Sequence, residues 1–331
     1  MLFAASIKNK PKDSLERSKL DSAKDKCPFE DPEASGNKVL ATYHADGFLS
    51  GTEGAKYSGS WFAKVLENKY SVVKTKYVIE KAKPYKSGPF DIVDAVGMQE
   101  VVIFKDHDRP LTKFSAPEMT FIFKIYKERF IEIAKSCASD YILIFNNYGA
   151  MAGASKYHPH SQIISTPVLP PDVERSITGS EEFYKKNGRK VYDVMIEWEL
   201  REKERIIYEN DEFVALCPFV SKTPYEVRVF PKSGSPYFEE ISDDILMKLG
   251  DILSKVFNKI NEKLGNPDFN FFVHTSPLNI RKYDNKAEDF YTWHVEILPK
   301  ISLAGGFELG SGIYVNVVDP NEAAKILKIS L

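Results

Sequence analysis

The chain repeats one order of predicted elements, and this internal repeat constrains its fold more than any other feature. In the first half, a strand at 98–104 is followed by a helix that starts after Ser115, and then by strands at 141–145 and 158–164. In the second half, a strand at 224–230 is followed by a helix that starts after Ser242, and then by strands at 269–273 and 293–298. We expect a shorter strand before each unit, at 68–73 and at 213–216. Units repeated in this way bury a shared core.

Capping residues and apolar spacing predict the two long helices. Ser115 and Glu118 have the spacing of a capping box, and Ser242 is a favoured N-cap. Apolar residues then recur at helical intervals along one face of each helix: Met119, Ile122, Tyr126, Phe130, Ile133 and Cys137 in the first, and Leu246, Leu249, Leu253, Val256, Ile260 and Leu264 in the second.

This pattern indicates an α+β fold of two repeats, with antiparallel sheets and helices packed on one face. We expect the first half to span residues 1–170 and the second to span residues 171–331. Prolines at 167–171 separate the halves, and residues 183–204 read as a connecting helix with Tyr192, Met195 and Trp198 on one side.

The composition is that of an ordinary globular chain. Apolar residues make up 43% and charged residues 28%, and the formal net charge is −2, which argues against nucleic acid as the main partner. The three cysteines, Cys27, Cys137 and Cys217, fit a reducing compartment. We find no signal-peptide pattern and no apolar run approaching 18 residues, so we expect a soluble, cytoplasmic protein with no membrane partner.

Segment 158–162, which reads His-Pro-His-Ser-Gln, carries the chemistry we expect. Alternate side chains of a strand point to the same face, so His158, His160 and Gln162 line one surface. Upstream, a loop of small residues runs from Asn147 to Ser155. Small residues let the backbone approach a ligand, and clustered N–H groups bind anions. These features predict a phosphate site that contains a nucleophile.

His160 is the predicted nucleophile. An imidazole attacks phosphorus when one ring nitrogen is free and the other is held by a hydrogen bond. Gln162 and Ser155 would bind the non-bridging phosphate oxygens without adding negative charge. Alternatively, the His-x-His pair is a metal site or two half-buried histidines. The small-residue loop and Gln162 favour the nucleophile.

The second half supplies no nucleophile of the same type in our alignment. It places Glu296 at the position of His160. We therefore expect one active centre for each pair of repeats.

From about Cys27 onward, the sequence resembles the galactose-1-phosphate uridylyltransferase family of the histidine-triad superfamily. The similarity is strongest at 145–167, where Asn-x-Gly, the small-residue loop and His-Pro-His-x-Gln occur in register. The segments 293–299 and 306–312 resemble the branch that includes plant ADP-glucose phosphorylase.

The resemblance implies a role for each part of the site. His160 would be the nucleophile and the carbonyl of His158 would orient it. Phosphate contacts would come from Asn147, Ser155 and Gln162, nucleoside contacts from Asn68, Lys69 and Tyr70, and sugar contacts from Phe307 and Glu308. In this family two subunits share the site, which implies a homodimer.

The resemblance also implies two metal sites, and the sequence departs from both. For a zinc site, Cys27, Glu30 and His158 are the candidate ligands; Glu30 replaces a second Cys and Gln99 replaces a His. For a second site holding zinc or iron, the candidates are Glu174, His274, His294 and Glu296, with Glu296 where a His is usual. The alternative for the second group is a polar cluster that bridges strands.

The implied reaction is ping-pong nucleotidyl transfer between a nucleoside diphosphate sugar and a hexose 1-phosphate, with no organic cofactor. Uridylyl transfer to galactose 1-phosphate is one form, and ADP-glucose phosphorolysis with inorganic phosphate as acceptor is the alternative. Two further hypotheses are a histidine-triad nucleotide hydrolase and a non-catalytic nucleotide-binding protein.

Overall fold

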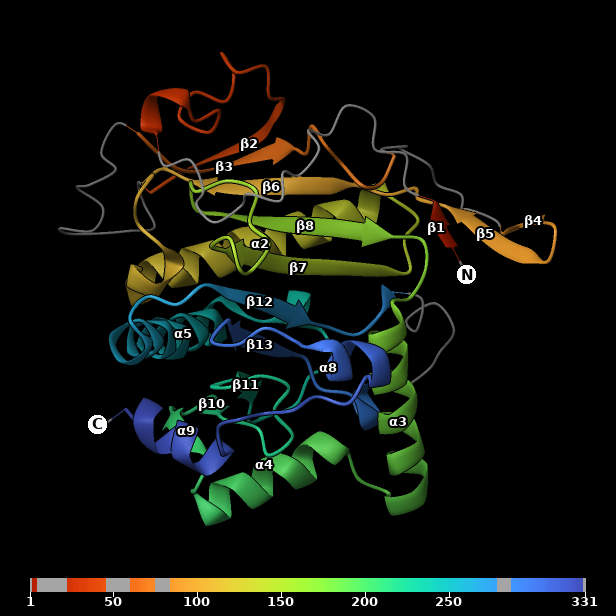
Figure 1. The fold of residues 1–331 in the computed structure, drawn as a ribbon, viewed down its shortest axis with the longest axis vertical. Helices are drawn as coiled ribbons and strands as arrows, with labels where there is room; N and C mark the ends of the chain where they lie inside the picture. The colour runs from red at the N-terminus through yellow and green to blue at the C-terminus, as the bar shows by residue number, and fades with distance from the viewer. Residues whose placement is uncertain (1, 5–22, 46–59, 75–83, 279–286, 330–331) are drawn as a thin grey trace.

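A computed structural model describes residues 2–4, 23–45, 60–74, 84–278 and 287–329 (Figure 1). Its main feature is a ten-stranded sheet in the order β2-β3-β6-β8-β7-β12-β13-β11-β10-β9, in which all neighbouring strands are antiparallel. The first repeat contributes β2 (Val39–His44), β3 (Trp61–Glu67), β6 (Gln99–Phe104), β7 (Tyr141–Tyr148) and β8 (His160–Thr166). The second contributes β9 (Ile206–Glu209), β10 (Phe213–Leu216), β11 (Val227–Pro231), β12 (Phe269–His274) and β13 (His294–Pro299). The two halves therefore form one continuous sheet, joined at β7 and β12.

The predicted repeat is confirmed by strand order, since each half has the same order from its outer edge to the central β7–β12 pair. The same offset relates the long helices and the strands that follow them: Ser242 lies 127 residues after Ser115, and Phe272 lies 127 residues after Phe145. Phe145 pairs with Gln162, and Phe272 pairs with Glu296.

These pairings correct our alignment of the last strands. Glu296 corresponds to Gln162, and His294 corresponds to His160. His294 is the first residue of β13, and His160 is the first residue of β8. The second repeat therefore does keep a histidine at the position of the predicted nucleophile.

Helices α2 (Ala116–Ser136) and α5 (Asp243–Leu264) cover one face of the sheet, as predicted (Figure 1). Ser115 and Glu118 form the capping box of α2, and Ser242 caps α5. The core between these helices and the sheet includes Ile122, Phe123, Ile163, Leu253, Phe257 and Phe271.

The segment between the halves is built differently from our prediction. Residues 183–204 lie in two helices, α3 (Pro171–Asn187) and α4 (Val191–Glu202), separated at Gly188, whose φ of +66° ends α3. Both pack on the other face of the second repeat, where Val173, Ile177, Tyr192 and Ile196 meet Val214, Leu216 and Phe230. The strand expected at 68–73 is also wrong: β3 ends at Glu67, and residues 68–73 form a turn.

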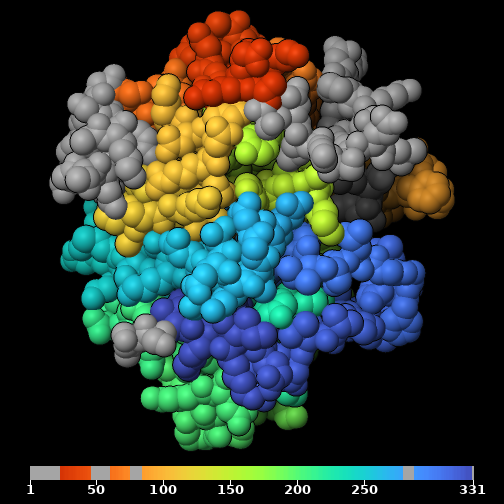
Figure 2. Space-filling view, turned by 60° about the vertical axis from the view of Figure 1, so that its left-hand side comes forward, coloured from red at the N-terminus to blue at the C-terminus, as the bar shows by residue number. Residues whose placement is uncertain are grey.

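Smaller elements complete the described chain. They are β1 (Leu2–Ala4), β4 (Tyr85–Ser87) and β5 (Phe90–Asp94) in a second sheet, short helices α7 (Ala287–Phe290), α8 (Gly306–Ser311) and α9 (Pro320–Leu327), and 3-10 turns at Lys24–Lys26, Leu111–Lys113 and Phe238–Glu240. Figure 2 shows the first repeat, in red to yellow, stacked above the second, in green to blue. Among the described helices, none combines the length and the apolar character that a membrane crossing requires.

Candidate active site

His160 begins β8 on the face of the sheet opposite α2. Ser161 points to the helix, since Tyr126 of α2 donates a hydrogen bond to its hydroxyl at 2.6 Å, so His160 and Gln162 point the other way. Nδ1 of His160 lies 2.9 Å from the carbonyl oxygen of His158. A carbonyl can only accept, so this contact assigns the proton to Nδ1 and leaves the lone pair on Nε2. Within the described chain, no other group is hydrogen bonded to this ring.

The environment of His160 favours its neutral form. The residue is 6% exposed, and the edge of the Phe29 ring lies against it at 5.5 Å between centroids. Burial lowers the pKa of His160 from its usual value. A neutral imidazole with a free Nε2 is the form that can attack an electrophile.

Gln162 is oriented by a second amide, Gln99. The backbone N–H of Val72 donates to Oε1 of Gln99 at 2.9 Å, and Nε2 of Gln99 donates to Oε1 of Gln162 at 2.8 Å. Asn68 places its own Nδ2 3.5 Å from the same oxygen. Because Oε1 of Gln162 is used as acceptor, its NH₂ group remains to donate to a ligand.

The other predicted nucleotide contacts lie around this pair. Asn147 stands on β7 one residue beyond Asn146, which pairs with Ser161, so it is next to His160 on the same face. Ser155 is exposed in the loop before β8, and Lys69 and Tyr70 are exposed in the turn that follows β3. The structure thus groups Asn68, Asn147 and Gln162 near His160.

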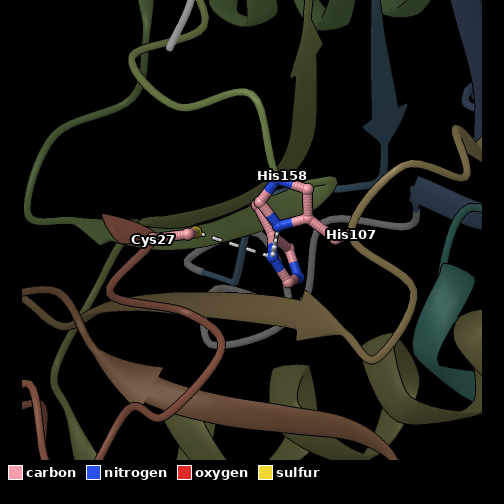
Figure 3. Close-up of side chains that lie close together, drawn as sticks. All are labelled: Cys27, His107 and His158. Carbon is pink, nitrogen blue, oxygen red and sulfur yellow. Dashed lines mark hydrogen bonds between the residues drawn. The ribbon is translucent and has the colours of Figure 1, made fainter. Parts of the chain in front are cut away.

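The side chains of Cys27, His107 and His158 come from separate loops and meet in one cluster, as Figure 3 shows. Sγ of Cys27 lies 3.7 Å from Nδ1 of His158, and Nδ1 of His107 lies 3.2 Å from the same atom. Glu30 completes the group, with Oε1 2.9 Å from Nδ1 of His107 and 3.3 Å from Nδ1 of His158.

His107 is a site residue that our sequence analysis missed. We expected Gln99 to stand in place of the missing histidine, but Gln99 contacts Gln162 instead. His107 lies in the loop after β6, and the signal that could have found it is its position between Asp106 and Asp108 just past an apolar strand.

The first cluster fits a tetrahedral metal ion. With metal–ligand bonds of about 2.0–2.3 Å, the ligand atoms of a tetrahedral zinc site lie about 3.3–3.6 Å apart. The contacts of Cys27, His107 and Glu30 with Nδ1 of His158, at 3.7, 3.2 and 3.3 Å, are close to this spacing. Nε2 of His158 lies 2.6 Å from the carbonyl oxygen of Phe104, which fixes the tautomer and leaves Nδ1 as ligand. Burial lowers the pKa of His158 to about 4, so the ring is neutral, as a ligand must be.

A second cluster joins His274, His294 and Glu296 on the face of the second repeat that carries α3 and α4. Nε2 of His274 lies 3.0 Å from Oε2 of Glu296, and the two imidazole rings stack at 4.8 Å. Glu174 is not among the grouped ligand atoms; it is exposed on α3.

Cations already surround the carboxylate of this second cluster. Nζ of Lys222 lies 3.4 Å and Nη2 of Arg228 lies 3.9 Å from Glu296. Burial alone would raise the pKa of Glu296, but the hydrogen bond from His274 and the charge of Arg228 outweigh burial and lower this pKa. The carboxylate is thus compensated by protein groups, and these residues fit a metal less well than the first cluster does.

A cavity of about 450 Å³ lies where the two repeats meet; its lining includes Leu143 and Met151 of the first repeat and His274, Glu296 and Glu308 of the second. Glu308 also caps α8, where its carboxylate accepts from the backbone N–H of Gly305 at 2.9 Å. Phe307 is 59% exposed on α8. Glu308 shares this cavity with Met151 of the small-residue loop, whereas neither Phe307 nor His160 is among its lining residues.

The sequence of this chain is similar to those of known proteins. Residues 49–170 match the family model described as galactose-1-phosphate uridyl transferase, N-terminal domain. ADP-glucose phosphorylase from Arabidopsis thaliana is 32% identical over 271 residues, which cover 81% of this chain and 74% of the relative. Galactose-1-phosphate uridylyltransferase from Thermotoga maritima is 29% identical over 252 residues, which cover 73% of this chain and 77% of the relative.

Solved structures agree with the sequence relatives. The crystal structure of an ADP-glucose phosphorylase from Arabidopsis thaliana with bound ADP-glucose superposes with a TM-score of 0.76 at 28% identity, covering 92% of this chain and 90% of that one. The X-ray structure of a GalT-like protein from the same plant gives a TM-score of 0.71 at 31% identity over 82% and 85%.

The two-repeat fold and these relatives define an enzyme of the nucleotidyltransferase class. The chain belongs to the galactose-1-phosphate uridylyltransferase family.

Proposed function

We propose that this enzyme moves a nucleoside monophosphate from a nucleoside diphosphate sugar to a second phosphate-bearing acceptor through a covalent intermediate on His160. The observation that carries the proposal is the 2.9 Å contact between Nδ1 of His160 and the carbonyl oxygen of His158. This contact leaves Nε2 unprotonated on the face that carries Asn147 and Gln162.

In the first step, Nε2 of His160 attacks the α-phosphorus and forms a P–N bond. The bond from that phosphorus to the bridging oxygen breaks, its electron pair stays on the oxygen, and the sugar 1-phosphate leaves. The ring in the adduct is cationic because Nδ1 keeps its proton, and the His158 carbonyl stabilises this charge. In the second step, a phosphate oxygen of the acceptor attacks, and the P–N bond breaks to restore the neutral ring.

The amide groups would stabilise the charge on the reacting phosphate. The free NH₂ of Gln162 and that of Asn147 are neutral donors, so they bind non-bridging oxygens without repelling the nucleophile or the substrate. Lys69, Tyr70 and Ser155 lie exposed at the edge of this face, where they would contact the rest of the nucleotide.

Two donors have support. A UDP-hexose, with galactose 1-phosphate as acceptor, is supported by the family model and by several relatives named galactose-1-phosphate uridylyltransferase. ADP-glucose, with inorganic phosphate as acceptor, is supported by the 32% identity to ADP-glucose phosphorylase and by the structural match to that enzyme with bound ADP-glucose.

Isotope exchange tests the proposal and separates the donors. The protein is incubated with ADP-glucose or UDP-glucose and labelled glucose 1-phosphate, without any other acceptor. A covalent intermediate predicts label in the nucleotide sugar that serves as donor. A hydrolase would release free nucleoside monophosphate without exchange of label. A non-catalytic binding protein would be stabilised by nucleotide without turnover. Either result would contradict the proposal.

We further propose that Cys27, Glu30, His107 and His158 hold a zinc ion. Four protein ligands leave no open coordination position, so the ion would be structural. These residues would then fix the loop before β8, and with it the His158 carbonyl that orients His160.

The dimer implied by the family also has support on the surface of the chain. Residues 303–317 expose a series of large apolar side chains: Leu303, Phe307, Leu309, Ile313, Tyr314, Val315 and Val317. In Figure 2 the C-terminal residues, in blue, form part of the surface of the second repeat. We propose that a second copy covers this apolar segment and that Phe307 and Glu308 reach the partner's nucleotide site.

A further inference from the structure

We propose that Asn270, on β12 of the second repeat, is a positioning residue that holds Asn147 with its NH₂ group toward the nucleotide phosphates. The proposal rests on the proposed function, because it assigns an orientation to a phosphate-binding side chain. It concerns a residue for which neither the sequence motifs nor the metal clusters supply a role.

Asn270 lies at the junction of the two repeats, where β12 pairs with β7 (Figure 1). It is directly opposite Asn147 and only 8% exposed. Its Nδ2 lies 2.8 Å from Oδ1 of Asn147 and also 2.8 Å from the carbonyl oxygen of Ala152. One buried amide thus joins the predicted phosphate-binding side chain to the small-residue loop.

These two contacts determine which way both amides face. The carbonyl of Ala152 can only accept, so the atom of Asn270 that faces it must be the donor nitrogen. The same nitrogen faces Asn147, so the atom of Asn147 at that contact must be its acceptor oxygen. Asn147 therefore has its own NH₂ left over, on the face that also carries His160 and the free NH₂ of Gln162.

Asp268, two residues before Asn270, fixes the same loop by an independent contact. Its Oδ2 accepts from the backbone N–H of Met151 at 2.7 Å. The approach is so close that a Cβ placed on Gly149 would lie 1.9 Å from Oδ1 of Asp268, and Gly149 itself has a φ of +84°. A side chain at 149 would be strained at this φ and would displace the Asp268 carboxylate from Met151, which explains the glycine at the start of the loop.

The second repeat therefore does more than duplicate the fold. Segment 268–270 holds the loop from Gly149 to Ala152 through two side chains, next to the strand that carries Asn147. A nucleotide oxygen would meet donors that are already oriented, which is the condition for stabilising charge that develops in a transition state. If Asn147 is no longer oriented, the chemical step should slow by more than the binding of the nucleotide sugar weakens.

Asn270→Asp and Asn270→Ala test this inference. The aspartate is nearly isosteric but cannot donate to Ala152 or Asn147 when ionised, and alanine removes the group. The rate of covalent adduct formation is followed by quenched intact-mass measurement over a range of ADP-glucose and UDP-glucose concentrations. For both variants we expect the rate at saturating donor to fall about 10- to 100-fold, with a smaller change in the donor concentration needed for half-saturation.

Asn210→Ala is the matched control. Asn210 is another amide of the second repeat, half-buried, that holds a turn. Its Nδ2 lies 2.8 Å from the carbonyl oxygen of Lys248 and its Oδ1 accepts from the backbone N–H of Phe213 at 2.9 Å, away from residues 147–155. We expect this variant to lower the Tm without lowering the adduct rate. The Tm of each Asn270 variant is measured alongside, so that a folding defect is recognised.

A double-variant cycle asks whether Asn270 acts through Asn147. If it does, Asn147→Ala with Asn270→Ala should form adduct no more slowly than Asn147→Ala alone. Multiplied rate losses in the double variant, or a wild-type rate in Asn270→Asp, would overturn the positioning role. Failure of the wild-type protein to form any adduct would overturn the proposed function itself, and with it this inference.

Discussion

His160 and His294 occupy equivalent positions in the two repeats, and each directs Nδ1 at the carbonyl oxygen two residues earlier, at 2.9 Å and 3.2 Å. Their surroundings differ. His294 stacks on His274 at 4.8 Å and on Phe230 at 5.0 Å, with interplanar angles of 24° and 32°. His160 lies edge-to-face against the ring of Phe29 and shares its face with amide donors. The same hydrogen bond from Nδ1 to a backbone carbonyl thus orients a packed ring in one repeat and the proposed nucleophile in the other.

The hydrogen bond from Gln99 to Gln162 predicts that a substitution of Gln99 slows the reaction, although Gln99 would not contact the substrate. Gln99→Met keeps the size of the side chain but removes its donor and acceptor. We expect kcat to fall about tenfold, against about 100-fold for Gln162→Met, which removes the phosphate donor itself. Steady-state kinetics with the active donor measures both. An unchanged kcat in Gln99→Met would show that Gln162 does not need this contact.

His107 should be required for metal binding. We expect His107→Ala to lose the zinc found in the purified wild-type protein by plasma mass spectrometry, and to lower the Tm by about 5–10 °C. Asp108→Asn is the control, because Asp108 is the exposed neighbour of His107 and is not among the clustered ligands. Full zinc content in His107→Ala, or none in the wild type, would contradict the assignment.

The apolar segment 303–317 should mediate dimerisation. Leu309 is 78% exposed, and we expect Leu309→Arg to convert the dimer to a monomer and to reduce turnover by at least tenfold, since each site would lose its partner's residues. Met247→Arg is the matched control, because Met247 is 57% exposed on α5, on the opposite face of the sheet. Light scattering coupled to size-exclusion chromatography measures the mass. A Leu309→Arg protein that remains dimeric would exclude this surface.

Glu118 should make stability depend on pH at the start of α2. Its carboxylate accepts from Arg109 and from the backbone N–H of Ser115. Burial raises its pKa, but these hydrogen bonds outweigh burial and lower the pKa below its usual value of 4.5. Because the folded-state pKa is the lower one, this stabilisation is complete above the unfolded value and is lost as pH falls through the folded value.

We therefore expect Glu118→Gln to lower the free energy of unfolding by about 3 kcal/mol at pH 7. The difference from wild type should shrink below pH 4.5, and urea unfolding across pH 3–8 measures it. A difference that stays constant across this range would show that the charge of Glu118 contributes nothing.

Local patterns in the sequence predicted the elements that follow from periodicity. The capping spacing at Ser115, the apolar intervals of both long helices and the alternation of residues 160–162 each depend on neighbours in the chain. The strand was expected from residue 158, but β8 begins at His160, and His158 lies in the preceding loop. For this reason the repeat, the long helices and the shared face of His160 and Gln162 could be predicted without coordinates.

The register of the strands could not be predicted from these local patterns. Side chains alternate with a period of two, so moving an alignment by two residues keeps every side chain on its face. This is why Glu296 rather than His294 was matched to His160. His107, Gln99 and Asn270 act through loops and strands distant in sequence, so only the pairing of β6 with β8 and of β7 with β12 brings them to the site.

The most direct test of the account is the mass of the intact protein after incubation with ADP-glucose or UDP-glucose. The account predicts a gain of one nucleoside monophosphate with the active donor, lost in His160→Ala and retained in His44→Ala, which removes an exposed histidine of β2. An adduct that persists in His160→Ala, or turnover of donor by wild-type protein that never carries an adduct, would contradict the assignment of His160 as the nucleophile.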